Sequence, residues 1–375
     1  MLQLLREWPP GFGGVERVAH CLAEELGGTV FTLRREPGLG VKGDATLSVT
    51  YRRCWLPGLL LGRLLLPMPS IALVRLLLNS DPLLVHLPCP TVLMLLWLAR
   101  LCRPQRQIWV YWHAFLAPRS GLAGQLEGLY QHLALRLIRS FEVITTSPQL
   151  QQALQVEGVQ VAQLHCLPCS LPRMVEIQCA SLWSHRENHH LPSGCVISIS
   201  RLESYKRIDW LIEAVAAAPA VRELHVIGDG PDRKSLIALA HQRLASHQRV
   251  VFHGRLSEAA KLKQLSLADV LVLASDRCNE AFGIVQLEAM ACGVPAVAFD
   301  LPRSGMYWVS QLPSIPWSGQ PDDLAAHLQH LLSSSAIQKE TSRQARQRFV
   351  NQFALNIWRN KLNQIIHSGC SINAL

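Results

Sequence analysis

Short apolar runs of four to six residues alternate with longer stretches whose apolar positions recur at helical spacing along most of the chain. The short runs predict β-strands, and the periodic stretches predict α-helices. Strands that alternate with helices form parallel sheets covered by helices. The pattern therefore predicts an α/β fold made of βα repeats.

The first half of the chain carries predicted strands at Leu2–Leu5, Val30–Leu33, Leu83–Leu87, Ile108–Trp112, Val143–Thr145 and Val161–Cys166. Predicted helices lie between them at Val15–Leu26, Val92–Cys102, Leu122–Arg139 and Pro148–Gln155. Periodicity is lost from Pro168 to Ser193, where His, Pro and Ser are frequent. We interpret this segment as an interdomain linker.

A second series of predicted strands comprises Cys195–Ser200, Glu223–Ile227, Arg249–Phe252, Val270–Leu273 and Ala296–Phe299. Its predicted helices are Arg207–Ala218, Asp232–Leu244, Glu258–Ser266 and Phe282–Ala291, and the tail Gln338–His367 is predicted to be helical. The two series predict a domain of residues 1–175, a domain of residues 176–350 and a last helix within residues 351–375.

Composition agrees with a two-domain globular protein. The chain has 375 residues, of which 49% are apolar and only 17% are charged. A net charge of +9 favours polyanionic partners such as phosphorylated ligands or an anionic membrane. Aromatic residues make up 6% and no run of five like charges occurs, so we expect no nucleic-acid partner.

Two apolar stretches raise the question of a membrane. Leu56–Leu78 contains Arg63, Arg75 and three prolines, and Pro82–Ala99 is broken by two internal prolines, so neither is expected to span a bilayer. Two interpretations of Leu56–Leu78 stay open. It could lie on an anionic membrane surface, or it could form a pair of core helices beneath the first sheet.

The eleven cysteines follow no regular framework, which is typical of buried thiols in a reducing compartment. The start lacks the apolar core of a signal peptide, so we expect a cytoplasmic protein, peripheral on the cytoplasmic face of the membrane. Cys166 and Cys169 precede His185 and His189 with a spacing that resembles a zinc site. The intervening residues lack a ββα pattern, so we favour chance spacing and expect no metal.

Glu280 and Glu288 stand eight residues apart around the predicted start of an apolar helix. The first carboxylate is expected in the loop before the helix, and the second about two turns further along. The first backbone N–H groups of a helix have no partner within the helix and suit a phosphate. Each carboxylate can accept two hydrogen bonds from a vicinal diol. Two diols with a diphosphate between them describe a nucleotide-sugar.

The surrounding residues, with Phe282, Gly283 and Ile284 before Glu288-Ala-Met-Ala and Gly293-Val-Pro after it, resemble the GT-B glycosyltransferases of retaining family 4. The resemblance implies two Rossmann-like domains facing a cleft, with the last helix crossing back to the first domain. It implies that Glu280 contacts the donor sugar and Glu288 the ribose. It also implies that the three residues between them line the donor site.

Arg201 and Lys206 follow the first strand of the second series, and ligands bind at the carboxyl edge of such sheets. The resemblance implies that these cations neutralise a leaving diphosphate. The alternative is two solvated cations at a helix start, where cations are unfavourable without an anion. We therefore favour the functional role.

Three loops resemble glycine-containing or backbone-contact loops of the same family. Gly228 and Gly230 follow a strand of the second series, and Leu256 follows the next one. Gly13 and Gly14 follow the first strand of the chain and open a helix. The resemblance implies that these residues line the donor site without taking part in the chemistry.

His113 ends a strand of the first half, where relatives read His-Ser-Asp and this chain has Ala114 and Phe115. The resemblance implies that His113 reaches the donor sugar. The alternative is a buried histidine with satisfied hydrogen bonds. The position at a strand end favours function.

The activity implied is transfer of a sugar, with retention, from a UDP- or GDP-sugar to a hydroxyl of a lipid-linked or cell-envelope glycan. No Asp-x-Asp occurs in the sequence, so neither a metal nor another cofactor is expected. The expected partners are a nucleotide-sugar donor, a glycan or glycolipid acceptor and an anionic membrane surface. A sugar-nucleotide epimerase and an inactive nucleotide-sugar-binding protein remain alternatives, whereas the missing dinucleotide fingerprint disfavours an oxidoreductase.

Overall fold

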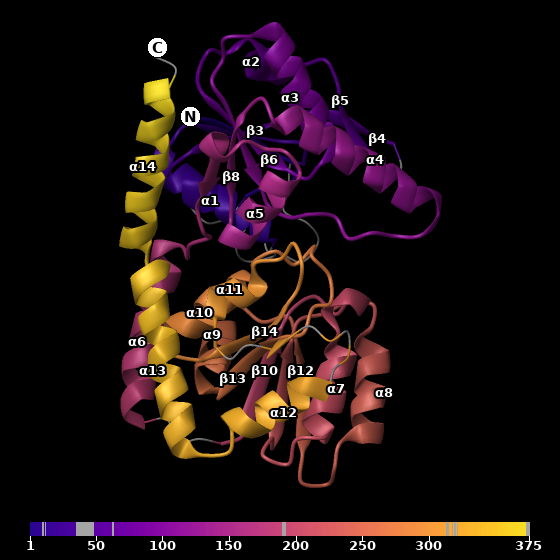
Figure 1. Cartoon of the computed structure of the whole chain (residues 1–375), viewed down its shortest axis with the longest axis vertical. Helices are drawn as coiled ribbons and strands as arrows, with labels where there is room; N and C mark the ends of the chain where they lie inside the picture. Colours follow the sequence, from indigo (N-terminus) through magenta and orange to yellow (C-terminus); the bar gives the residue numbers. More distant parts are fainter. Residues whose placement is uncertain are drawn as a thin grey trace. The chain divides into compact units, whose positions relative to one another are not determined.

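The computed structural model (Figure 1) describes residues 1–9, 11, 13–34, 49–61, 64–189, 193–312, 315–316, 318, 320 and 322–372. The chain divides into one unit of Met1–Cys169 with Leu362–Leu375 and a second unit of Ser170–Lys361. These bounds differ from the predicted 1–175, 176–350 and 351–375. Each unit carries its own parallel sheet, as predicted.

The first unit contains a seven-stranded parallel sheet in the order β3-β2-β1-β6-β7-β8-β9. Its strands are β1 (Leu2–Leu5), β2 (Thr29–Thr32), β3 (Arg52–Trp55), β6 (Leu83–Leu87), β7 (Ile108–Trp112), β8 (Glu142–Thr145) and β9 (Leu164–Cys166). The main helices are α1 (Gly14–Leu26), α3 (Pro90–Cys102), α4 (Gly121–Ile138) and α5 (Pro148–Val156). The predicted strands are confirmed, except that Val161–Gln163 forms a 3-10 turn before β9. The edge strand β3 was not predicted because two of its four residues are arginines and none is buried.

The apolar stretch Leu56–Leu78 is not a pair of helices. It forms an antiparallel hairpin of β4 (Gly58–Leu61) and β5 (Leu64–Pro67), followed by the single helix α2 (Ile71–Leu78). Of α2, only Leu76 is buried, and Leu59, Leu60 and Leu61 are each more than half exposed. Of the two interpretations left open, the pair of core helices is therefore wrong, and the membrane-surface segment stays a prediction. Arg63, on which the sequence analysis also relied, lies outside the described residues.

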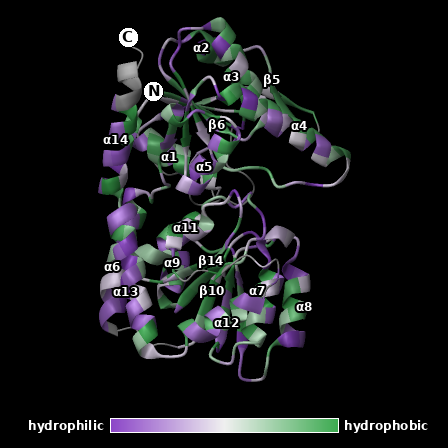
Figure 2. Cartoon of the chain, in the orientation of Figure 1, coloured by the Kyte–Doolittle hydropathy of each residue, from purple (hydrophilic) through white to green (hydrophobic). Residues whose placement is uncertain are grey.

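The second unit contains a parallel sheet in the order β12-β11-β10-β13-β14-β15, and its strands β10 and β14 are hydrophobic (Figure 2). The strands are β10 (Cys195–Ile199), β11 (Glu223–Ile227), β12 (Arg249–Gly254), β13 (Val270–Leu273), β14 (Ala296–Asp300) and β15 (Ile315–Pro316). The helices up to β15 are α6 (Arg173–His189), α7 (Ile208–Ala216), α8 (Arg233–Arg243), α9 (Glu258–Leu267), α10 (Ile284–Ala291) and α11 (Met306–Ser310). Helices α7, α8 and α12 (Asp322–Leu331) share one buried apolar cluster with alternate residues of the strands.

The prediction of a linker from Pro168 to Ser193 is wrong, because most of this segment forms α6. Cys179 and Arg186 are buried on this helix, and Arg186 donates to the carbonyl of Ser266 over 2.8 Å. Trp183 lies so close to Gly293 that a Cβ there would come within 2.1 Å of its ring. The other helices were predicted from aliphatic residues that recur at helical spacing. The inward face of α6 carries Cys, Trp and Arg instead, so this pattern is absent.

The tail contains two helices, α13 (Ser335–Gln352) and α14 (Leu355–Ile372), which meet at buried Phe353. The end of α14 belongs to the first unit, where Leu362 and Ile366 line a small apolar cavity with Leu84 and Trp109. The last helix therefore returns to the first unit, as the resemblance implied. Among the helices that the structure describes, none combines the length and apolar character that a bilayer span requires.

Candidate functional site

The loops at the carboxyl edge of the second sheet hold five of the predicted site residues. Because β10, β11 and β13 are parallel, the loops after them emerge at one edge, which carries Arg201, Lys206, Gly228, Gly230 and Glu280. Backbone hydrogen bonds join the first two loops. Ser200 N–H donates to the carbonyl of Ile227 over 3.0 Å, and Leu202 N–H donates to that of Asp229 over 3.0 Å.

Gly228 and Gly230 permit this close contact between loops. Gly228 has φ of +133°, and a Cβ on it would lie 1.8 Å from the carbonyl oxygen of Ser200. A Cβ on Gly230 would lie 2.3 Å from the carbonyl oxygen of Leu202. Both glycines are therefore needed to hold the Arg201 loop in place. Their predicted contact with a donor stays a prediction.

Lys206 and Glu280 form the centre of the edge. Lys206 ends the short turn η2 (Ser204–Lys206) and is buried, and its Nζ is paired with the Glu280 carboxylate. Burial acts to lower the pKa of Lys206, but Glu280 and Tyr205 outweigh it and hold the pKa above its ordinary value. The ammonium lies 5.0 Å from the centre of the Tyr205 ring. Lys206 is therefore a fixed cation beside a partly exposed carboxylate.

Glu280 is held by its own backbone. Its N–H donates to the carbonyl of Arg277 over 3.1 Å, and its carbonyl accepts from the Ser304 hydroxyl over 2.6 Å. These bonds fix the loop between β13 and α10 from both sides. The carboxylate is thereby presented to Lys206, 74 residues earlier in the chain.

Arg201 extends from the same edge into solvent. Its side chain is 71% exposed, with Nη1 2.9 Å from Glu203 and Nη2 3.3 Å from the Tyr205 hydroxyl. Arg201 and Lys206 thus offer one exposed and one buried cation to an anionic ligand. A pocket of about 350 Å³ opens nearby, lined by Glu203, Ser204 and Asp232 among others.

Arg207 is a structural residue at this edge that sequence reasoning did not single out. It adopts φ of +49° at the start of α7, and its guanidinium binds Asp209 and Asp276 over 2.7 and 3.3 Å. It also stacks on Trp210 at 3.6 Å from the ring centre. Arg207 therefore ties the loop after β13 to the turn that carries Lys206. The sequence offered one signal for this role, because Arg207 is a second cation directly after Lys206.

Helix α10 begins directly after Gly283, whose φ is +72°. A Cβ on Gly283 would lie 2.4 Å from Leu273, so glycine is required at this tight entry. Ile284 is the first residue of the helix and Phe282 is buried, with its ring against Trp308 and Phe353. Phe282 therefore stabilises the turn through packing, and its direct contact with a donor stays a prediction.

Glu288 is the fifth residue of α10, so it lies little more than one turn into the helix rather than the predicted two turns beyond Glu280, and it is fully buried. Its carboxylate lies 2.7 Å from the Nζ of Lys261 on α9, and the same Nζ lies 2.6 Å from Glu258. The structure thus places Glu288 in a buried ion pair. Its predicted contact with a ribose stays a prediction.

Leu256 stands at the carboxyl end of β12, just before the Ser257 cap of α9. It is partly buried, and because β12 pairs in parallel with β11, it lies at the same edge as Gly228. Its position agrees with a loop that contacts a ligand through its backbone.

In the first unit, Gly13 caps α1, which begins at Gly14. A Cβ on Gly13 would lie 2.0 Å from the Glu16 carboxylate, so the Glu16 side chain would have to move to admit a larger residue. An acidic residue in the first turn is favourable for the helix dipole. The predicted donor contacts of both glycines are not tested by this geometry.

His113 directly follows β7 and lies in a buried polar cluster. Its Nε2 lies 2.9 Å from Nδ1 of His86, which in turn lies 3.0 Å from the Gln3 amide. The ring stacks on Tyr111 at 4.5 Å between centres. Burial, followed by the neighbouring His86, holds the pKa of His113 well below its usual value, so the ring is neutral. This geometry matches the alternative of a satisfied buried histidine, and a catalytic role stays a prediction.

Two family models match the chain. One, described as glycosyl transferases group 1, matches residues 183–348, and the other, described as a glycosyl transferase 4-like domain, matches residues 13–170. HepE from Anabaena, solved in complex with UDP, is 18% identical, with a TM-score of 0.73 over 98% of this chain and 99% of that chain. Sucrose-phosphate synthase from Thermosynechococcus elongatus is 19% identical, with a TM-score of 0.74 over 99% of both chains.

Similar proteins also include N-acetyl-alpha-D-glucosaminyl L-malate synthase of Bacillus anthracis, 36% identical over 27% of this chain and 26% of that protein. Lipopolysaccharide 1,6-galactosyltransferase of Salmonella typhimurium is 29% identical over 36% of this chain and 37% of that protein. These matches span less than two fifths of either relative. The two family models together cover most of the chain, and the structural neighbours share its fold. The chain therefore belongs to the GT-B glycosyltransferases of family 4, the glycosyl transferases group 1.

Proposed function

We propose that the chain transfers a sugar, with retention, from a nucleotide-sugar to a hydroxyl of a lipid-linked or cell-envelope glycan. The observation that carries this is the Lys206–Glu280 pair with Arg201 beside it, at the carboxyl edge of a parallel sheet. The bond to be broken joins the sugar to the diphosphate, and a buried cation and a carboxylate at this edge suit these two groups. The cation suits the diphosphate, and the carboxylate suits the hydroxyls of the sugar.

In the proposed reaction, the bond between the anomeric carbon and the diphosphate oxygen breaks, and a new bond forms to the acceptor oxygen. Negative charge grows on the leaving diphosphate, where Lys206 and Arg201 stabilise it. The acceptor proton passes to the departing diphosphate, so no protein side chain is nominated as a base. Glu280 orients the sugar, Glu288 holds the ribose, and His113 takes the role implied for it at the sugar.

A thermal-shift screen of UDP-, GDP- and ADP-sugars tests the donor class. UDP-glucose is the first choice, because HepE has been solved in complex with UDP-glucose. A ligand that binds only the folded chain at 100 times its Kd adds about 2.7 kcal/mol of stability. At least one nucleotide-sugar should raise Tm, and the Lys206→Ala variant should lose only part of that rise, because its larger effect is expected on kcat. If none of these ligands raises Tm, the nucleotide-sugar proposal fails.

Turnover is expected to persist in excess EDTA. The charge on the diphosphate is met by Lys206 and Arg201, so no divalent cation is needed to bridge it. Release of nucleoside diphosphate should be measured after chelation and gel filtration, with and without added Mg²⁺ or Mn²⁺. Loss of turnover in EDTA with recovery on adding Mg²⁺ or Mn²⁺ would contradict this part of the proposal.

Exposed leucines on the first unit support a lipid acceptor and contact with a membrane. Leu122, Leu126, Leu129 and Leu133 follow one face of α4 and are between 52% and 73% exposed. The β4–β5 hairpin adds Leu59, Leu60 and Leu61. Exposed basic residues outnumber acidic ones between residues 64 and 139, where Arg75, Arg100, Arg103, Arg119, Arg136 and Arg139 stand against Asp81 and Glu127. Apolar side chains flanked by arginines suit an anionic bilayer surface.

Binding to vesicles is therefore expected to rise with anionic lipid content and to fall with salt. Replacing Leu59, Leu60 and Leu61 by serine should release the protein, as should Leu126→Ser with Leu129→Ser. Co-sedimentation measures binding, and a thermal melt of each variant shows whether it folds. Equal binding of the wild type to neutral and anionic vesicles, or binding to neither, would refute the electrostatic part. Unchanged binding of both folded variants would refute the apolar part.

A further inference from the structure

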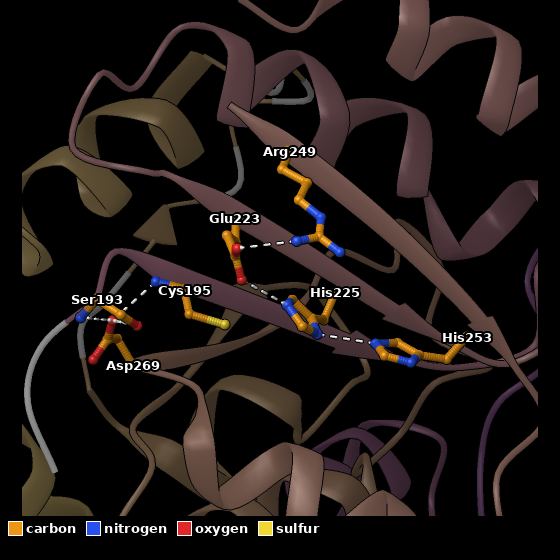
Figure 3. A network of polar contacts seen from close by, with 7 residues as sticks. All are labelled: Ser193, Cys195, Glu223, His225, Arg249, His253 and Asp269. Atoms are coloured by element: carbon orange, nitrogen blue, oxygen red, sulfur yellow. Dashed lines mark hydrogen bonds and ion pairs between the residues drawn. The ribbon is translucent and has the colours of Figure 1, made fainter. Parts of the chain in front are cut away.

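Three potential metal ligands meet on neighbouring strands of the second sheet (Figure 3). Cys195 and Glu223 are the first residues of β10 and β11 and stand opposite each other in the strand register. His225 lies two residues after Glu223, so its side chain shares the same face of the sheet. One ligand atom from each residue, a sulfur, an oxygen and a nitrogen, lies within 4.8 Å of the other two.

His225 is oriented by a partner on each ring nitrogen. Its Nε2 lies 3.0 Å from a carboxylate oxygen of Glu223, and its Nδ1 lies 2.9 Å from Nε2 of His253 on β12. A histidine that ligates a metal through one nitrogen needs a hydrogen-bond acceptor for the other. In the tautomer in which Nδ1–H of His225 donates to His253, the Nε2 lone pair faces the Glu223 carboxylate, and a cation between the two can bind both.

Cys195 is fixed by the start of its strand. It is buried, and its N–H donates to the Asp269 carboxylate over 2.9 Å. The same carboxylate oxygen accepts from the Ser193 N–H over 3.0 Å and from its hydroxyl over 3.3 Å. Because β10 pairs with β11 on one side and β13 on the other, the sulfur is held in a rigid part of the unit.

Thiolate, imidazole and carboxylate together are the ligand types that Zn²⁺ prefers, and four ligands in a tetrahedron are its usual number. We propose that Cys195, Glu223 and His225 bind one Zn²⁺, with a water molecule as the fourth ligand. Glu223 is 41% exposed, so water reaches this side of the cluster. Binding forms a Zn–S bond and releases the Cys195 proton to solvent. The thiolate and the carboxylate then balance the two charges of the ion.

The charged neighbours leave room for the ion. Arg249 lies 3.9 Å from Glu223, but it is largely exposed and can turn into solvent. Arg186 and Asp269 also act on the Cys195 thiol with opposite signs. Burial raises the pKa of this thiol to about 12, so the ion has to displace its proton. Of the two nearby cations, Arg249 can therefore move away from the site, and the charge of Arg186 is compensated by the Asp269 carboxylate.

The site belongs to the amino ends of the strands, whereas Arg201, Lys206 and Glu280 belong to the carboxyl ends. A strand of five residues separates these two edges by roughly 13 Å. The ion would join β10 to β11 without touching the donor chemistry. This proposal therefore does not depend on the proposed function.

Zinc binding is tested on the full chain after removal of metal with a chelator. Zn²⁺ is added, excess is removed by gel filtration, and bound zinc is counted by atomic emission. The wild type should retain one more zinc per chain than Cys195→Ser, His225→Ala or Glu223→Gln. Cys102→Ser removes an exposed thiol elsewhere and should retain the wild-type amount, as should the double variant Cys166→Ser with Cys169→Ser. His253→Ala should weaken binding roughly 10–100-fold by removing the partner of Nδ1.

Co²⁺ provides a second readout, since a thiolate ligand gives it a charge-transfer absorption that Cys195→Ser should lack. Glu223→Gln is the variant least expected to disturb folding, because Glu223 is partly exposed, and its Tm without metal checks this. Its donor-induced rise in Tm should equal that of the wild type, which separates this site from the donor site. Equal zinc content in the wild type and all three ligand variants, or no zinc retained by the wild type, would overturn the proposal.

Discussion

Lys206→Ala is expected to lower kcat by roughly 10²–10³-fold at saturating donor, the effect of removing a single electrostatic contact to the transition state. Lys206 is buried, and its pKa stays above the ordinary value because Glu280 and Tyr205 outweigh desolvation. Charge on the diphosphate develops as the glycosidic bond breaks, so the ammonium acts most strongly in the transition state. The loss should therefore be larger in kcat than in the affinity for donor.

Three further variants make this result interpretable. Arg201→Ala should also lower kcat by roughly 10²–10³-fold, because its guanidinium is the second cation at this edge. Lys206→Met keeps most of the buried volume, so an equal loss there excludes a packing defect. Lys263→Ala, which removes an exposed lysine on α9, should leave kcat unchanged. A folded Lys206→Ala with wild-type kcat would show that Lys206 does not stabilise the leaving group.

Glu288→Ala is expected to reduce both stability and donor affinity. Removing one partner of a buried ion pair costs about 3–5 kcal/mol, because the other charge is left uncompensated. Here Lys261 keeps Glu258 as a second partner, so we expect a loss of stability toward the lower end of that range. Lost charge-assisted bonds to a ribose should weaken donor binding by about 1.5–3 kcal/mol. Urea unfolding measures the first effect and calorimetry the second.

Glu288→Gln separates the two roles, because it keeps the shape of the side chain and removes its charge. The double variant Glu288→Gln with Lys261→Met also removes the buried Lys261 ammonium, which has lost one of its two partners, and should regain part of the lost stability. Donor affinity should stay low in both. Wild-type affinity in either folded variant would exclude Glu288 from the donor site and leave it a purely structural residue.

The fold of the second unit could be predicted because its strands are short, continuous apolar runs. Such runs are typical of parallel strands buried on both faces, and those from Cys195 to Phe299 were placed to within one or two residues. Helix α6 was missed because its buried face carries Cys179, Trp183 and Arg186 in place of aliphatic residues. The β4–β5 hairpin was missed because its leucines are exposed, which no hydrophobic pattern predicts.

The candidate site was predicted as a set of residues, but their pairing was not. Lys206 and Glu280 lie 74 residues apart in sequence, and only the parallel order of β10 and β13 brings their loops together. The partner of Glu288 likewise depends on how α9 packs against α10. His113 was singled out from its place at a strand end, but its contact with His86 comes from the neighbouring strand β6. Such contacts follow from sheet order, which periodicity does not reveal.

The measurement that tests the central claim most directly is NMR of the sugar product formed from the nucleotide-sugar that raises Tm, with membrane glycolipid as acceptor. An α-linked donor should give nucleoside diphosphate and an α-linked glycoside in equal amounts, and Lys206→Ala should slow both by roughly 10²–10³-fold. A β-linked product would contradict retention. If the wild type releases no nucleoside diphosphate from a donor that it binds, the claim that this chain is a glycosyltransferase is wrong.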